Sequence, residues 1–222
     1  MLRIAIDGAC RRNGKPDCVS SGGVFIQLFK ENTLVATDTR SNYELNSTNQ
    51  RGELLALLTA LDYVHASRQD TQIITDSEYL FNAMTKVWYD KWSANGWLTA
   101  SGEPVKNADI WREVMVAKHR CDFNGIDITF YHIKGHVIPF GKVTAERLLK
   151  LDPSGALLQS EARKKYDQIK ATKATTLAAA QELSVKNNGF ELSDDILRDF
   201  VVANVVVDAV ATSVVELADR KI

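Results

Sequence analysis

The stretch Thr48-Asn-Gln-Arg-Gly-Glu-Leu-Leu-Ala-Leu-Leu58 marks where the chain changes from successive strands to alternating helices and strands. Its polar start, followed by leucines at helical spacing, predicts a helix over residues 50–66. Working outward, the β-branched run 71–75 predicts a short strand that ends at Asp76, and Ser77 begins a second helix. The order strand, helix, strand, helix is typical of an α/β sheet with helices packed on it.

The segments on either side complete this sheet. Residues 2–6, 22–29 and 33–40 are apolar or β-branched runs separated by polar loops, which predicts three antiparallel strands. Downstream, residues 111–119 predict a helix and residues 127–133 a last strand. We therefore expect one mixed α/β sheet with helices packed on it.

The segment 137–203 differs in kind from the rest of the chain. It is rich in Ala, Lys, Glu and Leu, which predicts several helices with boundaries near Pro153 and at Asn187-Asn188-Gly189. The capping sequence Ser193-Asp194-Asp195 then begins an apolar helix that runs towards Leu217.

Composition limits the class of protein. The 222 residues are 45% hydrophobic and 25% charged with a formal net charge of −1, which excludes collagen-like, disordered and disulfide-scaffold proteins. We expect a cytoplasmic protein without a membrane partner, because no apolar stretch approaches about 20 residues and no basic-then-apolar leader begins the chain. Cys10, Cys18 and Cys121 lack metal-site spacing, and we expect them to be reduced thiols.

Three acidic residues lie where strands end or helices begin: Asp7, Glu53 and Asp76. If these elements are neighbours in one sheet, their carboxylates converge. Clustered carboxylates repel one another and are stable mainly when they hold a hard cation such as Mg²⁺ or Mn²⁺. Taken singly, each acid also fits a local role, in a turn, in the first turn of a helix or at a helix cap.

Seven segments of the chain resemble, in order, the motifs of the type 1 ribonuclease H family. They are Asp7-Gly8-Ala9, Gly22-Gly23, Thr48 to Ala56, Thr75 to Tyr79, Asn95 to Thr99, Pro104 to Asn107, and Lys134-Gly135-His136. The spacings of the four tryptophans also fit that family. The resemblance covers residues 1–136 and resumes over about 204–215.

The resemblance implies a ribonuclease H-like fold, with a five-stranded mixed sheet flanked by helices. It implies an endonuclease that hydrolyses the RNA strand of RNA–DNA hybrids and leaves 5′-phosphate and 3′-hydroxyl ends. Four carboxylates would hold two divalent ions, Mg²⁺ or Mn²⁺, that act in an in-line displacement. By position, Asp7, Glu53 and Asp76 become metal ligands, and His136 becomes the mobile histidine that assists proton transfer or product release.

The fourth carboxylate is separated from the others by an insertion. In the family, a last helix carries Asn-x-x-x-Asp, and the good match here is Asn204-Val-Val-Val-Asp208. We expect Asp208 to be the fourth ligand, because a carboxylate in an apolar helix is costly unless it is paired or coordinated. The alternatives are Glu146, ten residues past His136, and Asp152 beside a proline.

We therefore divide the chain into a ribonuclease H-like domain, residues 1–136 and 204–222, and a helical insertion, residues 137–203. The role of the insertion is open. Its basic residues could extend the hybrid-binding surface, it could be a helical hairpin that only packs on the core, or it could dock a replication protein. We expect the protein to be a monomer.

The resemblance also implies residues that contact the substrate. Telling a hybrid from duplex DNA requires groups that reach ribose 2′-hydroxyls across the minor groove. By family position, Cys10, Asn13, Asn49 and Gln50 would make these contacts, Thr48 would lie near a DNA phosphate, and Trp88 and Trp92 would grip the DNA strand.

Two other functions remain open at this point. Integrases, transposases and junction resolvases also place clustered carboxylates on this fold, so a DNA nuclease or resolvase is an alternative. A hybrid-binding module with a weak catalytic site is another.

Overall fold

The computed structural model describes residues 1–13, 15 and 17–219. Its five strands are β1 (Leu2–Arg11), β2 (Val19–Lys30), β3 (Thr33–Leu45), β4 (Thr71–Thr75) and β5 (Ile128–His132), in the sheet order β3-β2-β1-β4-β5. The first three strands pair antiparallel, whereas β4 runs parallel to β1 and β5 parallel to β4. The expected five-stranded mixed sheet is therefore confirmed.

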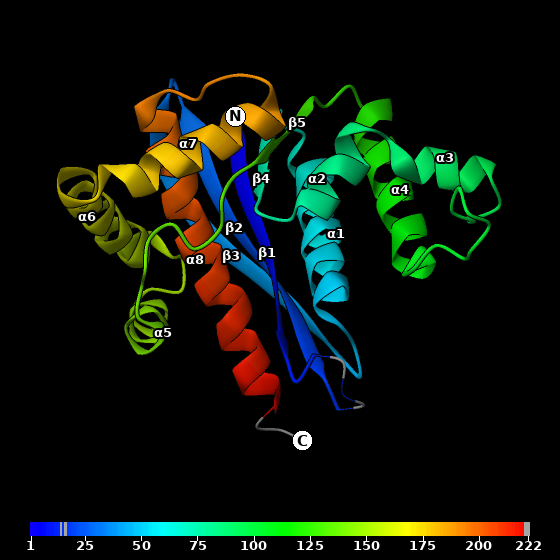
Figure 1. Cartoon of the computed structure of the whole chain (residues 1–222), viewed down its shortest axis with the longest axis horizontal. Coiled ribbons are helices and arrows are strands. Elements are labelled where there is room, and N and C mark those ends of the chain that lie inside the picture. The colour runs from blue at the N-terminus through cyan, green and yellow to red at the C-terminus, as the bar shows by residue number, and fades with distance from the viewer. Residues whose placement is uncertain (14, 16, 220–222) are drawn as a thin grey trace.

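Helices follow the strands in the predicted order (Figure 1). They are α1 (Asn49–Ser67), α2 (Glu78–Thr85), α3 (Trp88–Ala94), α4 (Ala108–Phe123), α5 (Lys142–Leu151), α6 (Ala156–Thr172), α7 (Ala174–Asn188) and α8 (Asp194–Asp219). The predicted helix stop is also present, because α7 ends at Asn188 and Gly189 caps it with a positive φ of 80°.

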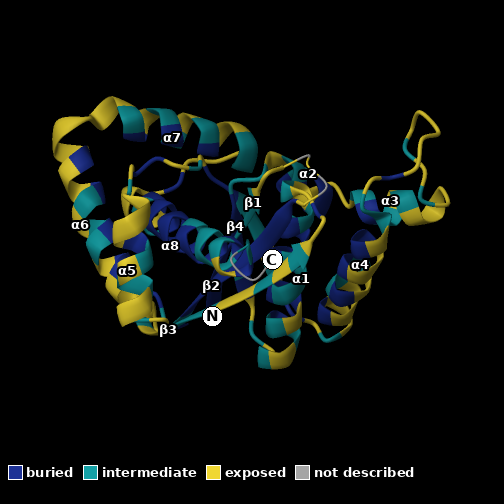
Figure 2. Ribbon diagram, turned by 90° about the horizontal axis from the view of Figure 1, so that it is seen from below, coloured by how far each residue is buried: buried dark blue, intermediate teal, exposed yellow. Residues whose placement is uncertain are grey.

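Two hydrophobic layers cover the two faces of the sheet. Ile4, Ile6 and Val24 pack on the face that α1 and α4 cover, whereas Ala5 and Phe25 lie on the face that α8 covers. This alternation is the period of two that a strand imposes on its side chains. Figure 2 shows the inner side of α8 as buried and the outer side of α6 as largely exposed, with α3 partly exposed. Within the sheet, β1 and β2 are largely buried, whereas β3 has no buried residue.

Gly23 lets α8 lie close against the sheet. A Cβ atom at this position would come within 2.8 Å of both the Val207 carbonyl oxygen and the Ala211 nitrogen. Gly23 is also the residue of β2 that pairs with Asp7 of β1. The close approach therefore brings the middle of α8, which carries Asp208, to the part of the sheet that carries Asp7.

α8 is longer and more apolar than we expected for any segment of the chain. An 18-residue window of this helix has a mean hydropathy of 1.9, enough by length and composition to cross a membrane, so the expectation that no such stretch exists is wrong. In the folded chain 67% of that window is buried. Its apolar side chains form the core between the sheet and the insertion.

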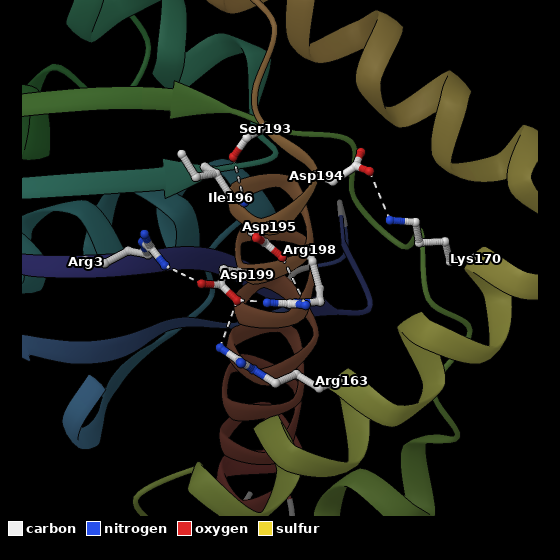
Figure 3. Close-up of polar contacts among 9 residues, drawn as sticks. All are labelled: Arg3, Arg163, Lys170, Ser193, Asp194, Asp195, Ile196, Arg198 and Asp199. Carbon is white, nitrogen blue, oxygen red and sulfur yellow. Dashed lines mark hydrogen bonds and ion pairs between the residues drawn. The ribbon is translucent and has the colours of Figure 1, made fainter. Parts of the chain in front are cut away.

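Ion pairs fasten the insertion to the sheet (Figure 3). Asp199 of α8 accepts from Arg3 of β1 at 3.2 Å and from Arg163 of α6 at 2.8 Å. Arg3 is only 6% exposed and lies over the rings of Phe29 and Phe200. Moving α6 or α8 away would leave the buried Arg3 charge without its partner, which is strongly destabilising. This network therefore holds both helices against the strand that carries Asp7.

The division into a domain and an insertion remains a prediction. Its boundary at residue 203 falls inside α8, which continues from Asp194 to Asp219.

Candidate active site

Four carboxylates from four different parts of the chain approach one another at one end of the sheet. Asp7 lies on β1, Glu53 on α1, Asp76 directly after β4, and Asp208 on α8. Burial raises the pKa of Asp7 well above its ordinary value, and the negative charges of Asp76, Asp208 and Glu53 raise it further. The parallel pairing of β1 with β4 explains how residues 69 positions apart meet, because the register that pairs Ala5 with Ile74 continues to Asp7 and Asp76 two residues further on.

The pKa values of two more of these acids are raised. Burial, together with the charge of Asp76, raises the pKa of Glu53 to about 6, against the lowering effect of a hydrogen bond from Ser77. Burial also raises the pKa of Asp208, as does the charge of Asp76, while His136 and Lys142 lower it. Asp7, Glu53 and Asp208 therefore all experience the charge of Asp76, which disfavours the ionised form of each.

Hydrogen bonds fix the orientation of Glu53. Ser77 Oγ donates to Glu53 Oε2 at 2.5 Å, and Asn49 Nδ2 donates to Glu53 Oε1 at 3.2 Å. Ser77 is also the N-cap of α2, as its position after Asp76 predicted. The bond from Ser77 to Glu53 was missed, because nothing in the sequence shows that the start of α2 lies against α1.

Glycines allow the chain to approach two of the carboxylates. A Cβ atom at Gly8 would lie 2.5 Å from the Glu53 nitrogen, and one at Gly135 would overlap Asp76 Oδ2. Both glycines belong to motifs that the sequence analysis singled out, Asp7-Gly8 and Lys134-Gly135-His136. Their role is to bring the ends of β1 and β5 close to the acids.

The donor set fits hard divalent cations. Carboxylate oxygens are the ligands that Mg²⁺ prefers, and clustered acids with raised pKa values gain most from a positive charge between them. As they stand, no three Asp, Glu, His or Cys side chains among residues 1–13, 15 and 17–219 lie close enough together to ligate a single ion.

The structure distinguishes Asp208 from the two alternative fourth ligands. Asp152 is engaged as a cap, because it accepts from Ser154 and from the Leu157 N–H at 2.8 Å. Glu146 lies on α5, where hydrogen bonding to Glu216 raises its pKa. Glu146 and Asp208 line the same cavity of about 190 Å³, but only Asp208 acts on the pKa of Asp7. These contacts favour Asp208.

His136 lies next to Asp208, in the turn after β5. It is exposed, has a positive φ of 54°, and is close enough for its charge to lower the pKa of Asp208.

The residues expected to contact substrate gather in part at the start of α1. Asn13 and Asn49 lie together, since Asn13 Oδ1 accepts from the Asn49 N–H at 3.5 Å. Thr48 is the N-cap of α1, and both it and Gln50 are exposed. Since Asn49 also contacts Glu53, this polar surface is continuous with the carboxylates.

Cys10 requires a correction. The structure joins Cys10 to Cys18 in a disulfide across the β1–β2 hairpin, so the expectation of three reduced thiols is wrong for this pair and holds for the free, buried Cys121. In this state Cys10 has no thiol hydrogen to donate to a ribose. The sequence could not indicate the pair, because two cysteines eight residues apart meet only once the strand register is known.

Trp88 and Trp92 lie on α3, one turn apart. Their rings are 5.9 Å apart, and Trp92 packs on the fully buried Trp111 at 5.3 Å. Both are half-buried, so each contributes to the core and presents part of its ring outside. A hybrid contact by these two residues remains a prediction.

Several cations of the insertion already have partners within the chain. Arg163 pairs with Asp199, Lys164 with Glu161, and Lys170 with Asp194, while Lys165 lies over the Phe140 ring. These contacts favour packing over phosphate binding for this part of the insertion.

Known proteins share this sequence and fold. The RNase H family model matches residues 2–149, a range that includes Glu146 and stops before Asp208. Among curated proteins, the ribonuclease H of Chlorobaculum parvum is 36% identical over 61% of this chain and 83% of its own length. The ribonuclease H of Zymomonas mobilis is 33% identical over 72% of this chain and 93% of its own length.

Solved structures show the same fold at lower identity. LC9-RNase H1, described as a type 1 RNase H with the type 2 active-site motif, superposes with a TM-score of 0.51 at 23% identity, covering 61% of this chain and 63% of its own. The solution structure of the PFV RNase H domain gives a TM-score of 0.52 at 23% identity, covering 63% of this chain and 81% of its own.

Proposed function

Because the chain belongs to the ribonuclease H family, we propose that it is an endonuclease that hydrolyses the RNA strand of RNA–DNA hybrids. The convergence of Asp7, Glu53, Asp76 and Asp208 at one end of the sheet carries this proposal. Two divalent ions, Mg²⁺ or Mn²⁺, would supply an activated water and stabilise the leaving oxygen, which leaves a 5′-phosphate and a 3′-hydroxyl.

The chain's own residues orient these ions and move protons. Ser77 and Asn49 hold the Glu53 carboxylate in a fixed direction, so that it is ready to bind an ion. His136 is placed beside Asp208 and open to solvent, where it would deliver a proton to the leaving oxygen or help the product to depart.

The start of α1 would read the hybrid. Asn13, Asn49 and Gln50 would offer amide donors and acceptors to ribose 2′-hydroxyls, and the exposed Thr48 would contact a phosphate of the DNA strand. α3 and the loop after it would contact the DNA strand through Trp88 and Trp92.

The DNA nuclease and the binding module stand as alternatives to this proposal. The family match and the polar start of α1 favour the ribonuclease over a resolvase. The presence of all four acids favours an enzyme over a module that only binds. The cytoplasmic location, the monomeric state and a replication partner remain predictions from the sequence.

The test is a substrate panel. End-labelled RNA is presented as single strand, as RNA duplex and as RNA–DNA hybrid, next to duplex DNA, with Mg²⁺ or with EDTA. We expect cutting of the hybrid alone, only with Mg²⁺. Cutting of the DNA duplex would support the resolvase, and tight hybrid binding without cutting would support the binding module.

A further inference from the structure

The insertion reaches the active site through the end of α7. Figure 1 shows α7 passing beside β5, and its last two residues, Asn187 and Asn188, both contact His132. Asn188 Oδ1 accepts from the His132 main-chain N–H at 2.9 Å, and Asn188 Nδ2 donates to the His132 carbonyl oxygen at 2.9 Å. One amide thus satisfies both main-chain groups of His132, on the outer side of β5, the edge strand of the sheet.

The neighbouring Asn187 contacts the imidazole of the same residue. Asn187 Nδ2 lies 2.7 Å from His132 Nδ1, and His132 Nε2 lies 3.2 Å from the Asp76 carbonyl oxygen. The His132 side chain is buried, with only 3% exposure, and packs on Phe81.

These partners determine the tautomer of His132. A carbonyl oxygen only accepts, so the hydrogen bond to Asp76 requires the proton on Nε2. Nδ1 of the neutral ring is then an acceptor, which matches the amide donor of Asn187. The chain of donors therefore runs in one direction, from Asn187 through His132 to Asp76.

Asp76 is held from β5 on a second side. The turn that follows β5 brings Gly135 so close to the Asp76 carboxylate that no side chain fits between them. Since Asp76 follows the last residue of β4, its main chain has left the sheet ladder, and its direction depends on such contacts from β5.

We propose that Asn187, Asn188 and His132 are positioning residues through which the insertion holds Asp76 in the direction that a divalent ion requires; this inference rests on the proposed role of Asp76 as a metal ligand. Partners that orient metal ligands typically contribute 10-fold to 100-fold to metal affinity or activity. The insertion, whose role the sequence leaves open, would thus be part of the catalytic apparatus.

The test measures Mn²⁺ binding to the full chain by calorimetry, together with hybrid cleavage. His132→Phe keeps the ring and removes both nitrogen contacts, and we expect it to weaken Mn²⁺ affinity at least tenfold. His132→Gln can place an amide donor near the Asp76 carbonyl, and we expect it to restore part of the affinity. Asn187→Leu keeps approximate volume without a donor and should weaken binding several-fold.

A matched control lies on the same helix. Gln181 Nε2 donates to the Leu192 carbonyl oxygen at 2.6 Å, so Gln181→Ala removes a hydrogen bond of α7 that does not reach His132. We expect it to leave Mn²⁺ affinity unchanged. If His132→Phe does not fold, two measurements still test the inference. They are the Mn²⁺ affinity of Asn187→Leu and the nitrogen chemical shifts of His132, which report the Nε2–H tautomer.

Wild-type affinity in both His132→Phe and Asn187→Leu, or a proton on Nδ1, would overturn the inference while leaving the proposed function intact. Wild-type protein that neither binds Mn²⁺ nor cuts the hybrid would overturn both.

Discussion

Glu53 shows how single contacts set the chemistry of the site. Burial and the charge of Asp76 raise its pKa, whereas the hydroxyl of Ser77 lowers it. The balance leaves the pKa at about 6, so at neutral pH the carboxylate is largely ionised and available to a cation. Ser77 therefore favours the form of Glu53 that can bind metal.

Ser77→Ala tests this balance. Without the hydroxyl donor, the pKa of Glu53 should rise above about 6 in the metal-free protein, as carboxyl chemical shifts during a pH titration would show. We also expect hybrid cleavage at neutral pH to fall about tenfold, because a less ionised and less oriented ligand binds metal more weakly.

The control for this variant is Ser77→Thr, which keeps both the hydroxyl and the helix cap. It should retain the wild-type pKa of Glu53 and most of the activity. An unchanged pKa in Ser77→Ala would show that the hydroxyl does not act on Glu53.

At this scale the sequence indicated some roles and missed others. Asp7, Glu53 and Asp76 could be chosen because each lies in a recognisable motif, although Asp7 falls inside β1 and not at its end as expected. The hydrogen bond from Ser77 and the disulfide at Cys10 depend on which loops meet, and that is decided by strand register and helix packing.

Among the elements, α8 determines whether the fourth acid reaches the site. Its approach to β2 depends on Gly23, where a methyl group would overlap the helix backbone. Because Gly23 pairs with Asp7, any outward shift of the helix increases the separation between Asp7 and Asp208.

Gly23→Ala should therefore reduce activity more than it reduces stability. Overpacking of this kind costs about 1–3 kcal/mol of unfolding free energy, which thermal unfolding measures, and we expect cleavage to fall more than tenfold even where the variant is fully folded. Gly141→Ala is the control, since a Cβ there meets only Thr144 Oγ1 at an ordinary 3.6 Å. Equal activities of the two variants would contradict this account of α8.

Some helix boundaries were predictable, but strand ends and element packing were not, since β1 and β3 each extend five residues beyond the predicted 2–6 and 33–40. Gly189, Pro153 and Thr48 end or begin helices through local backbone chemistry that the sequence displays. The contact of α7 with β5 joins residues 56 positions apart and follows no local rule, so it could only be found in the folded chain.

For the whole molecule, the acid cluster links stability to pH and to metal. The pKa of Glu53 is about 6 in the folded chain against an ordinary value of 4.5, so the folded state holds the proton more tightly. The stabilisation that the folded state gains from this tighter proton binding is fully present below about pH 4.5 and is lost as the pH rises through 6. In metal-free protein at pH 8, the ionised group costs up to about 2 kcal/mol.

Glu53→Gln should consequently stabilise the metal-free protein. We expect its free energy of unfolding to be up to about 2 kcal/mol higher than that of wild type at pH 8 and equal to it near pH 4. Denaturant titrations at the two pH values measure this difference. Saturating Mg²⁺ should stabilise the wild type more than the variant.

Glu44→Gln should change the free energy of unfolding at pH 8 in the opposite direction. Hydrogen bonding to Arg51 lowers the pKa of Glu44, so its contribution is present at pH 8 and is lost on acidification. This variant should be less stable than wild type at pH 8. A destabilised Glu53→Gln at pH 8 would contradict the picture of an electrostatically strained cluster.

That Asp208 is the fourth metal ligand is tested most directly by comparing it with the other candidate, Glu146. Both are compared in one cleavage assay on the RNA–DNA hybrid with Mg²⁺. The structure predicts that Asp208→Asn loses at least a hundredfold in cleavage rate while keeping its fold, and that Glu146→Gln stays within a few-fold of wild type. Loss of cutting in Glu146→Gln with retention in Asp208→Asn would contradict the account and place the fourth ligand on α5.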